Sequence, residues 1–107
     1  MKIYISGKIT GLDRVAYLTK FALAEQNLRD KGYSVINPAA VNGRLPDDTT
    51  YNQYMDMSML MLSWCDAIYM LDNWKDSPGA TREKEEAERN GLTVMYQEVR
   101  DGNACKV

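Results

Sequence analysis

Histidine is absent from the 107 residues of this chain, and its absence excludes a wide range of chemistry. Ser-His-Asp and Cys-His catalytic arrangements, histidine general bases and histidine-rich zinc sites all lack their central residue. The two cysteines, Cys65 and Cys105, are forty residues apart and form no CxxC motif, which excludes a dithiol redox motif and a multi-thiolate metal site. Acid–base chemistry therefore falls to carboxylates, lysine, tyrosine or cysteine, and we expect neither a metal nor a cofactor.

Long apolar runs and a broad basic surface are also missing. No run approaches the roughly 18 apolar residues of a membrane span, and Gly7 interrupts the N-terminal stretch too early for a secretory signal. A net charge of −2 provides too few cations for sequence-independent binding to a phosphate backbone. We therefore expect a cytoplasmic protein that binds neither membranes nor long nucleic acid, and its length fits one domain over residues 1–107.

Strand-like segments alternate with helical segments along the chain. Short β-branched or aromatic runs predict strands over residues 2–6, 33–36, 67–71 and 92–96. Helical spacing predicts helices between Asp13 and Gly32 and over residues 51–64 and 80–90, with loops over 37–50 and 72–79 and an irregular tail over 97–107. This order predicts an α/β, three-layer, flavodoxin- or Rossmann-like fold, in which helices cover both faces of a four- to five-stranded parallel sheet.

The helix over residues 51–64 is unusually rich in methionine and is apolar around most of its circumference. Such a helix needs cover on two sides. One cover is the sheet, and a partner subunit is the favoured second cover because flexible methionine side chains suit adaptable contacts. We therefore expect a homodimer or higher homo-oligomer formed through this helix, with burial inside the domain as the alternative.

Ligands of parallel α/β folds bind at the carboxyl ends of the strands, which makes the loops over residues 7–13, 37–50 and 72–79 the candidate ligand-binding segments. In the first loop, Gly7 and Gly11 permit close backbone approach, while Ser6, Lys8 and Thr10 offer hydroxyls and a charge. The segment is neither GxGxxG nor a P-loop, and a tight turn without a ligand is equally compatible with it. In the later loop, the free backbone N–H groups of the next helix could hold an anion, although an ordinary helix cap explains the same residues.

That next helix has Ser77 as its predicted N-cap and carries one carboxylate on its inward stripe. With a residue every 100°, Glu83 lies between Ala80 and Ala87 and is aimed toward the strand ends. Burying a carboxylate is costly unless it is paired, hydrogen-bonded or protonated. Glu83 is therefore either tied to the first loop, for instance through Lys8, or acts as a nucleophile or general base.

Aromatic residues supply the remaining part of a predicted nucleotide pocket. Tyr4 lies near the end of the first strand, Tyr51 and Tyr54 begin the methionine-rich helix, and Trp74 lies in an otherwise polar loop. A nucleobase could stack among these rings. Trp74 in particular is predicted to contact the substrate.

Three segments are distinctive when they are taken together. They are Tyr4-Ile5-Ser6-Gly7-Lys8-Ile9-Thr10-Gly11, the methionine-rich helix running into Cys65-Asp66-Ala67-Ile68, and Asp76-Ser77-Pro78-Gly79-Ala80-Thr81-Arg82-Glu83. Over roughly residues 1–96 the chain resembles the nucleoside 2-deoxyribosyltransferase-like superfamily, in particular a small uncharacterised phage and bacterial branch. Among characterised members it looks more like the 2'-deoxynucleoside 5'-phosphate N-hydrolases, which carry Ser-x-Gly-x-x-x-Glu where this chain has Ser77, Gly79 and Glu83.

The resemblance implies cleavage of an N-glycosidic bond, or transfer of the deoxyribosyl group, on a deoxynucleoside or its 5'-monophosphate. It implies that Glu83 is the nucleophile and that Tyr4 positions it. It further implies that Gly7 and Ile9 lie against the nucleotide, with Lys8 on the same loop. Ser77 and Gly79 would hold the 5'-phosphate. The transferases that act on free nucleosides carry Asp where Ser77 stands, and a carboxylate there would repel a phosphate.

Two positions depart from the pattern of the family. Ser58 stands where these enzymes usually carry the Asp that protonates the leaving base, and Thr10 stands where the hydrolases have Arg. Ser58 remains a candidate substrate contact. The departures leave two alternatives open: a catalytically inactive protein that sequesters or senses a nucleotide, and a structural or adaptor protein whose methionine-rich helix is its working surface.

Overall fold

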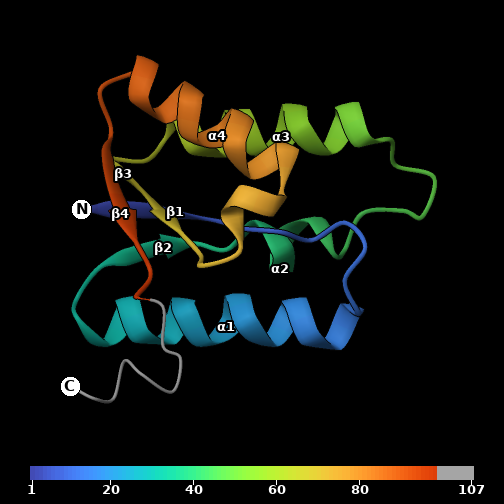
Figure 1. Cartoon of the computed structure of the whole chain (residues 1–107), viewed down its shortest axis with the longest axis horizontal. Coiled ribbons are helices and arrows are strands. Elements are labelled where there is room, and N and C mark those ends of the chain that lie inside the picture. Colours follow the sequence, from blue (N-terminus) through green and yellow to red (C-terminus); the bar gives the residue numbers. More distant parts are fainter. Residues whose placement is uncertain (99–107) are drawn as a thin grey trace.

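A parallel β-sheet lies between two layers of helices in the computed structural model, which describes residues 1–98 (Figure 1). Along the chain the elements are β1 (Lys2–Ser6), α1 (Arg14–Asp30), β2 (Ser34–Ile36), α2 (Pro38–Asn42), α3 (Tyr51–Ser63), β3 (Ala67–Met70), the short 3-10 helix η1 (Trp74–Asp76), α4 (Pro78–Arg89) and β4 (Thr93–Tyr96). The tail predicted over residues 97–107 lies outside the described residues apart from 97 and 98.

The sheet has four strands in the order β2-β1-β3-β4, and every neighbouring pair is parallel. Helices α1 and α2 cover one face, while α3 and α4 cover the other (Figure 1). This arrangement confirms the predicted three-layer α/β fold. The strand order changes direction at β1, where the chain leaves the sheet centre first for β2 and then for β3, so the loop after β1 lies at the position where such folds bind ligands.

Strand β1 presents different chemistry to the two helical layers because successive side chains of a strand point to opposite faces. Ile3 and Ile5 are fully buried in an apolar core with residues of α1, including Phe21 and Leu28. Tyr4 and Ser6 are equally buried on the opposite face, beneath α3 and α4. The second core contains the other inward residues, which are Met61, Leu62, Cys65, Ile68, Met70, Ala80 and Ala87.

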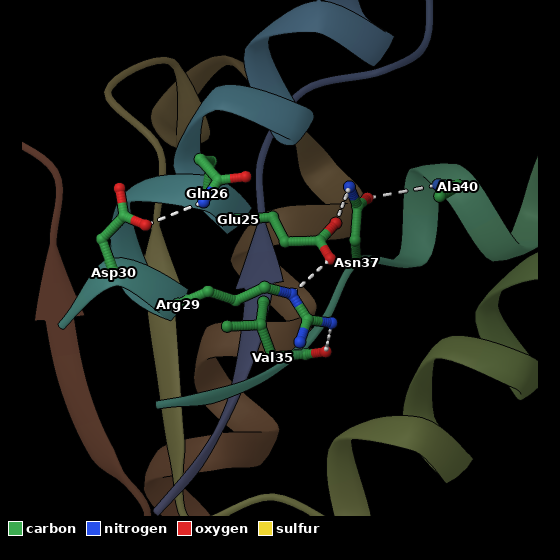
Figure 2. A network of polar contacts seen from close by, with 7 residues as sticks. All are labelled: Glu25, Gln26, Arg29, Asp30, Val35, Asn37 and Ala40. Atoms are coloured by element: carbon green, nitrogen blue, oxygen red, sulfur yellow. Dashed lines mark hydrogen bonds and ion pairs between the residues drawn. The ribbon is translucent and has the colours of Figure 1, made fainter. Parts of the chain in front are cut away.

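The predicted loop over residues 37–50 contains the short helix α2, which is a correction to the sequence-based expectation. Asn37 caps this helix by accepting a hydrogen bond from the Ala40 N–H, and Pro38 occupies its first position. Figure 2 shows that α1 holds the cap from the side: Asn37 donates to Glu25, which in turn accepts from Arg29. This network fixes the start of α2 against the end of β2.

Helix α3 is covered on one side only by the described residues. Its capping box, formed by Thr50 and Gln53, confirms the predicted helix start. Its inward residues include Met55, Ser58, Met61 and Leu62, whereas the outward Leu60 and the following Trp64 are 50% and 55% exposed. The second cover expected for this helix is therefore not supplied from within residues 1–98. No described helix has the length and apolarity needed to cross a membrane.

Candidate functional site

A cavity of about 750 Å³ opens beyond the carboxyl end of β1. Its walls come from the loop after β1, the first turns of α1, helix α2, the inward side of α3 and the N-terminal half of α4. Tyr51 and Tyr54 of α3, predicted to flank a nucleobase, are both in the lining. The volume lies within the range of small-molecule sites, and apolar walls with a few converging polar groups are typical of them.

Glu83 lies at the base of this cavity and is 7% exposed. Its Oε2 accepts a hydrogen bond from the Tyr4 hydroxyl at 2.7 Å, and its Oε1 accepts one from the Ser6 hydroxyl at 2.6 Å. Within residues 1–98 no lysine or arginine forms an ion pair with Glu83. The carboxylate is thus held by two neutral donors. The predicted alternative of a tie to the first loop does occur, as the hydrogen bond from Ser6, whereas an ion pair with Lys8 does not.

Two local sequence features bring these three side chains together. Tyr4 and Ser6 are two residues apart on β1 and therefore point to the same face of the sheet. Ser77 caps α4 by accepting from the Ala80 N–H, which sets the start of that helix, and Glu83 follows on its buried stripe between Ala80 and Ala87. The periodicity of β1 and that of α4 therefore place two hydroxyl groups and one carboxylate next to one another.

Burial and hydrogen bonding act on Glu83 in opposite directions. Burial raises the pKa of Glu83 above the usual value of a glutamate, while the hydrogen bonds from Ser6 and Tyr4 and the nearby Ser58 hydroxyl lower it again without cancelling the rise. Burial and the neighbouring carboxylate also raise the pKa of Tyr4, so that hydroxyl keeps its proton and remains a donor. A carboxyl group with a raised pKa and no cationic partner is typical of acid–base and nucleophilic sites.

Most of the predicted site residues meet at this cavity. Those that line it are Tyr4, Gly7, Lys8, Ile9, Ser58, Ser77, Gly79 and Glu83. Trp74 is the exception, because η1 directs it toward the end of β4. There Trp74 packs against Tyr96 with ring centroids 6.1 Å apart, beside a separate hollow of about 360 Å³. The expectation that Trp74 contacts a ligand in the main cavity is therefore corrected.

Gly7 and Gly79, two of the glycines in the lining, differ in whether the packing of the protein requires glycine there. A Cβ on Gly7 would come within 2.6 Å of Leu71 Cδ1, so the packing of the first loop on the end of β3 requires glycine there. A Cβ on Gly79 would meet nothing nearer than 3.5 Å, which is ordinary contact with Met55 and Tyr51. Glycine at position 79 is therefore not demanded by the protein's own packing, and it leaves space above the first turn of α4.

Several polar residues of the lining were not identified from the sequence. Arg14 begins α1 and brings a guanidinium group to the cavity, where it donates to the Gly43 carbonyl at 3.3 Å. Asn42 of α2 also lines the cavity, and its Oδ1 is buried without a hydrogen-bond partner. Asp47 and Asp76 add two carboxylates. The placement of Arg14 at the cavity could have been inferred from its position directly after the Asp13 cap. The placement of Asn42 depends on helix α2, which the sequence did not predict.

Metal binding has little support in this part of the chain. Residues 1–98 contain no group of three histidine, cysteine or acidic side chains placed to share an ion. Cys65 is buried, and burial raises the pKa of its thiol to about 11, which disfavours the thiolate that a metal would need.

Comparison with known proteins identifies a family and a shared fold. A family model described as a domain of unknown function, DUF4406, matches residues 1–96, and the chain belongs to this family. No curated protein matches the chain. Among solved structures, a 2-deoxyribosyltransferase from Bacillus psychrosaccharolyticus is similar with a TM-score of 0.70 and 21% identity, over 99% of this chain and 81% of that chain. Likeness at this level of identity concerns the fold.

Proposed function

We propose that this protein cleaves the N-glycosidic bond of a 2'-deoxynucleoside 5'-monophosphate or of the corresponding nucleoside, with Glu83 as the nucleophile. The observation that carries the proposal is a buried carboxylate without a cationic partner at the base of a cavity of about 750 Å³, held by the Tyr4 and Ser6 hydroxyls. The resemblance of segments 4–11 and 76–83 to nucleoside 2-deoxyribosyltransferase-like proteins supports the same chemistry.

The proposed reaction is a double displacement at C1' of the sugar. A Glu83 carboxylate oxygen attacks C1', and the C1'–N bond breaks with its electron pair leaving on the base, which takes up a proton. Water, or the nitrogen of a second base, then attacks C1' of the glycosyl ester and releases Glu83 as a carboxylate. Hydrolysis yields the free sugar or sugar phosphate, and attack by a second base yields a new nucleoside.

Preference for a 5'-phosphate is supported by the start of α4 and by two cations in the lining. In the first turn of α4, Pro78 has no N–H and the Ala80 N–H donates to Ser77 Oγ, so the Gly79 N–H is the one left without a partner among residues 1–98. Ser77 stands at the cap in place of a repelling carboxylate. Lys8 and Arg14 bring two cations to the lining, which also contains the carboxylates of Asp47 and Asp76. Arg14 is our candidate for the phosphate contact that Thr10 cannot make. A phosphate near this helix start would place the attached sugar close to Glu83, which is four residues beyond Gly79 on α4.

The test is to incubate the protein with each deoxynucleoside and each deoxynucleoside 5'-monophosphate and to measure free base by liquid chromatography. We expect base release that falls at least about 1000-fold in Glu83→Gln, the scale associated with loss of a nucleophile. Glu85→Gln is the matched control, because Glu85 is an exposed carboxylate on the same helix. Base release that survives in Glu83→Gln would show that another group attacks the sugar.

A second candidate function is nucleotide binding without turnover. The observation favouring it is Ser58, which is buried in the cavity wall at the position where the resemblance places the acid that protonates the leaving base. In that case a monophosphate at 100 times its Kd raises the free energy of unfolding by about 2.7 kcal/mol, while no base appears. If no nucleotide changes the Tm, both candidates fail and an adaptor role through α3 remains. The predicted cytoplasmic location and the absence of long nucleic-acid partners stay predictions.

A further inference from the structure

The first turn of α4 lies close to the first residue of α3 in the wall of the main cavity. A Cβ built on Gly79 would be 3.5 Å from the hydroxyl oxygen of Tyr51 and 3.8 Å from Ser77 Oγ. All three residues line the cavity of about 750 Å³. The side chain that glycine lacks therefore leaves a space beside two hydroxyl groups, one from α3 and one from the cap of α4.

The polar groups around this space have protons left to donate. The Gly79 N–H has no partner among residues 1–98, and no residue of that range accepts a hydrogen bond from the Tyr51 hydroxyl. Ser77 Oγ accepts from the Ala80 N–H, which leaves the Ser77 hydroxyl proton available. Donors that converge on one space favour a group with several acceptor oxygens. A phosphate has three such oxygens, whereas the 5'-hydroxymethyl group of a free nucleoside has one.

Tyr51 is placed by local structure before any ligand arrives. It is the first residue of α3 and follows Thr50, whose capping box with Gln53 fixes the start of that helix. A tyrosine hydroxyl is carried on a rigid ring with only two side-chain torsions, so little conformational entropy is lost when it binds a ligand. The structure thus holds a donor beside the start of α4 in advance.

We propose that the Tyr51 hydroxyl donates to the 5'-phosphate of the substrate and selects monophosphates over free nucleosides. This assignment rests on the proposed function, because it concerns the phosphate end of the proposed substrate. A hydrogen bond to a charged phosphate oxygen is stronger than one to a neutral hydroxyl, so the Tyr51 hydroxyl favours the phosphorylated substrate. Stacking of the Tyr51 ring on a nucleobase would not need that hydroxyl, and Tyr54 remains the candidate for the base.

Tyr51→Phe tests the assignment because it removes the hydroxyl and keeps the ring. We expect the ratio of kcat/KM for a deoxynucleoside 5'-monophosphate to kcat/KM for the matching nucleoside to fall about 10- to 100-fold, through a higher KM for the monophosphate. Tyr96→Phe is the matched control, because Tyr96 is 54% exposed, close to the 48% of Tyr51, and lies outside the main cavity. An unchanged ratio in Tyr51→Phe, or equal losses with both substrates, would overturn the assignment.

A binding measurement separates this assignment from the proposed reaction. Glu83→Gln removes the nucleophile, so calorimetric titration with the deoxynucleoside 5'-monophosphates reports binding alone. Adding Tyr51→Phe to Glu83→Gln should raise the Kd of a monophosphate about 10- to 100-fold and that of the nucleoside less. A monophosphate Kd that stays the same, or no binding of any monophosphate to Glu83→Gln, would refute the role of Tyr51. The expected shift in Kd without base release by wild type would refute the glycosidase and leave the role of Tyr51 standing.

Gly79→Ala tests whether the space beside Tyr51 is the one that the phosphate occupies. The added Cβ makes only ordinary contacts, and Gly79 has no positive φ, so the variant should fold with a Tm at or above that of wild type. Filling the space should nevertheless raise the Kd of a monophosphate about 10-fold, because the phosphate can no longer reach both the Gly79 N–H and the Tyr51 hydroxyl. A folded Gly79→Ala variant with the wild-type Kd would show that the phosphate lies elsewhere.

Discussion

The two faces of the sheet are packed equally tightly but contain different chemistry. Toward α1, the buried residues of β1 are Ile3 and Ile5, which pack in a cluster of apolar residues. Toward α3 and α4, the buried residues of the same strand are Tyr4 and Ser6, which hydrogen-bond to the carboxylate of Glu83. A single five-residue strand therefore serves stability on one face and a polar site on the other.

The difference between the two faces shows on which face the protein buries an energetically unfavourable group. Burying hydrocarbon is favourable, whereas burying a carboxylate is unfavourable even when hydroxyl groups satisfy it. The α1 face has no such group. Substitutions on the two faces should consequently differ. On the α1 face we expect a large loss of stability with the chemistry retained, and around Glu83 we expect altered chemistry with a smaller change in stability.

The largest effect on stability is expected on the apolar face. Ile3→Ala removes a fully buried side chain from the core against α1 and should lower the free energy of unfolding by about 2–5 kcal/mol. Urea denaturation followed by circular dichroism measures the loss. Base release per folded molecule should stay at the wild-type level, and a selective loss of turnover would show that the two faces are not independent.

An intermediate effect is expected from Ser6→Ala, which leaves Glu83 Oε1 without its hydroxyl donor. An unsatisfied buried acceptor lowers the free energy of unfolding by about 1–3 kcal/mol. The Ser6 hydrogen bond lowers the pKa of Glu83, so its removal raises that pKa further. Because the nucleophile must be ionised, the acidic limb of the pH–rate profile should move to higher pH. A profile that stays in place would show that Ser6 is merely structural.

The smallest effect on stability is expected from Glu83→Gln, and it has the opposite sign. The folded pKa of Glu83 is raised, so its contribution to stability is fully present below the ordinary pKa of a glutamate and is lost as pH rises through the folded pKa. At neutral pH the variant should therefore unfold with a free energy about 1 kcal/mol higher than wild type. Thermal unfolding from pH 4 to pH 8 measures this gap, which should narrow toward acid; a gap that widens toward acid contradicts the sign.

Local patterns were sufficient to predict the four strands, the three longer helices and the orientation of the key carboxylate. The cap at Ser77 and the helical stripe through Ala80 and Ala87 place Glu83 inward without any knowledge of its neighbours, and the structure has it 7% exposed. The capping box at Thr50 likewise located the start of α3. These predictions succeed because they depend on periodicity and on hydrogen bonds between residues only three or four apart.

Contacts between distant segments could not be predicted in the same way. Ser6 meets Glu83 across 77 positions of sequence, and the ring of Trp74 faces Tyr96 instead of the cavity. The direction of Trp74 depends on the single turn of η1, and the unpartnered oxygen of Asn42 depends on α2, whose cap is held from α1. Each of these outcomes requires two or more elements to be placed first.

The amino-acid order by itself determined the alternation of strands and helices, the parallel three-layer class and the inward aim of one glutamate, since each follows from local periodicity and capping. Only the tertiary structure decided that this carboxylate is held by two hydroxyls and, within residues 1–98, by no cation. It also decided that Arg14 and Asn42 join the same cavity and that those residues leave one side of α3 uncovered. Such features arise from the packing of separate elements, because strand register and helix placement fix distances that no single segment encodes.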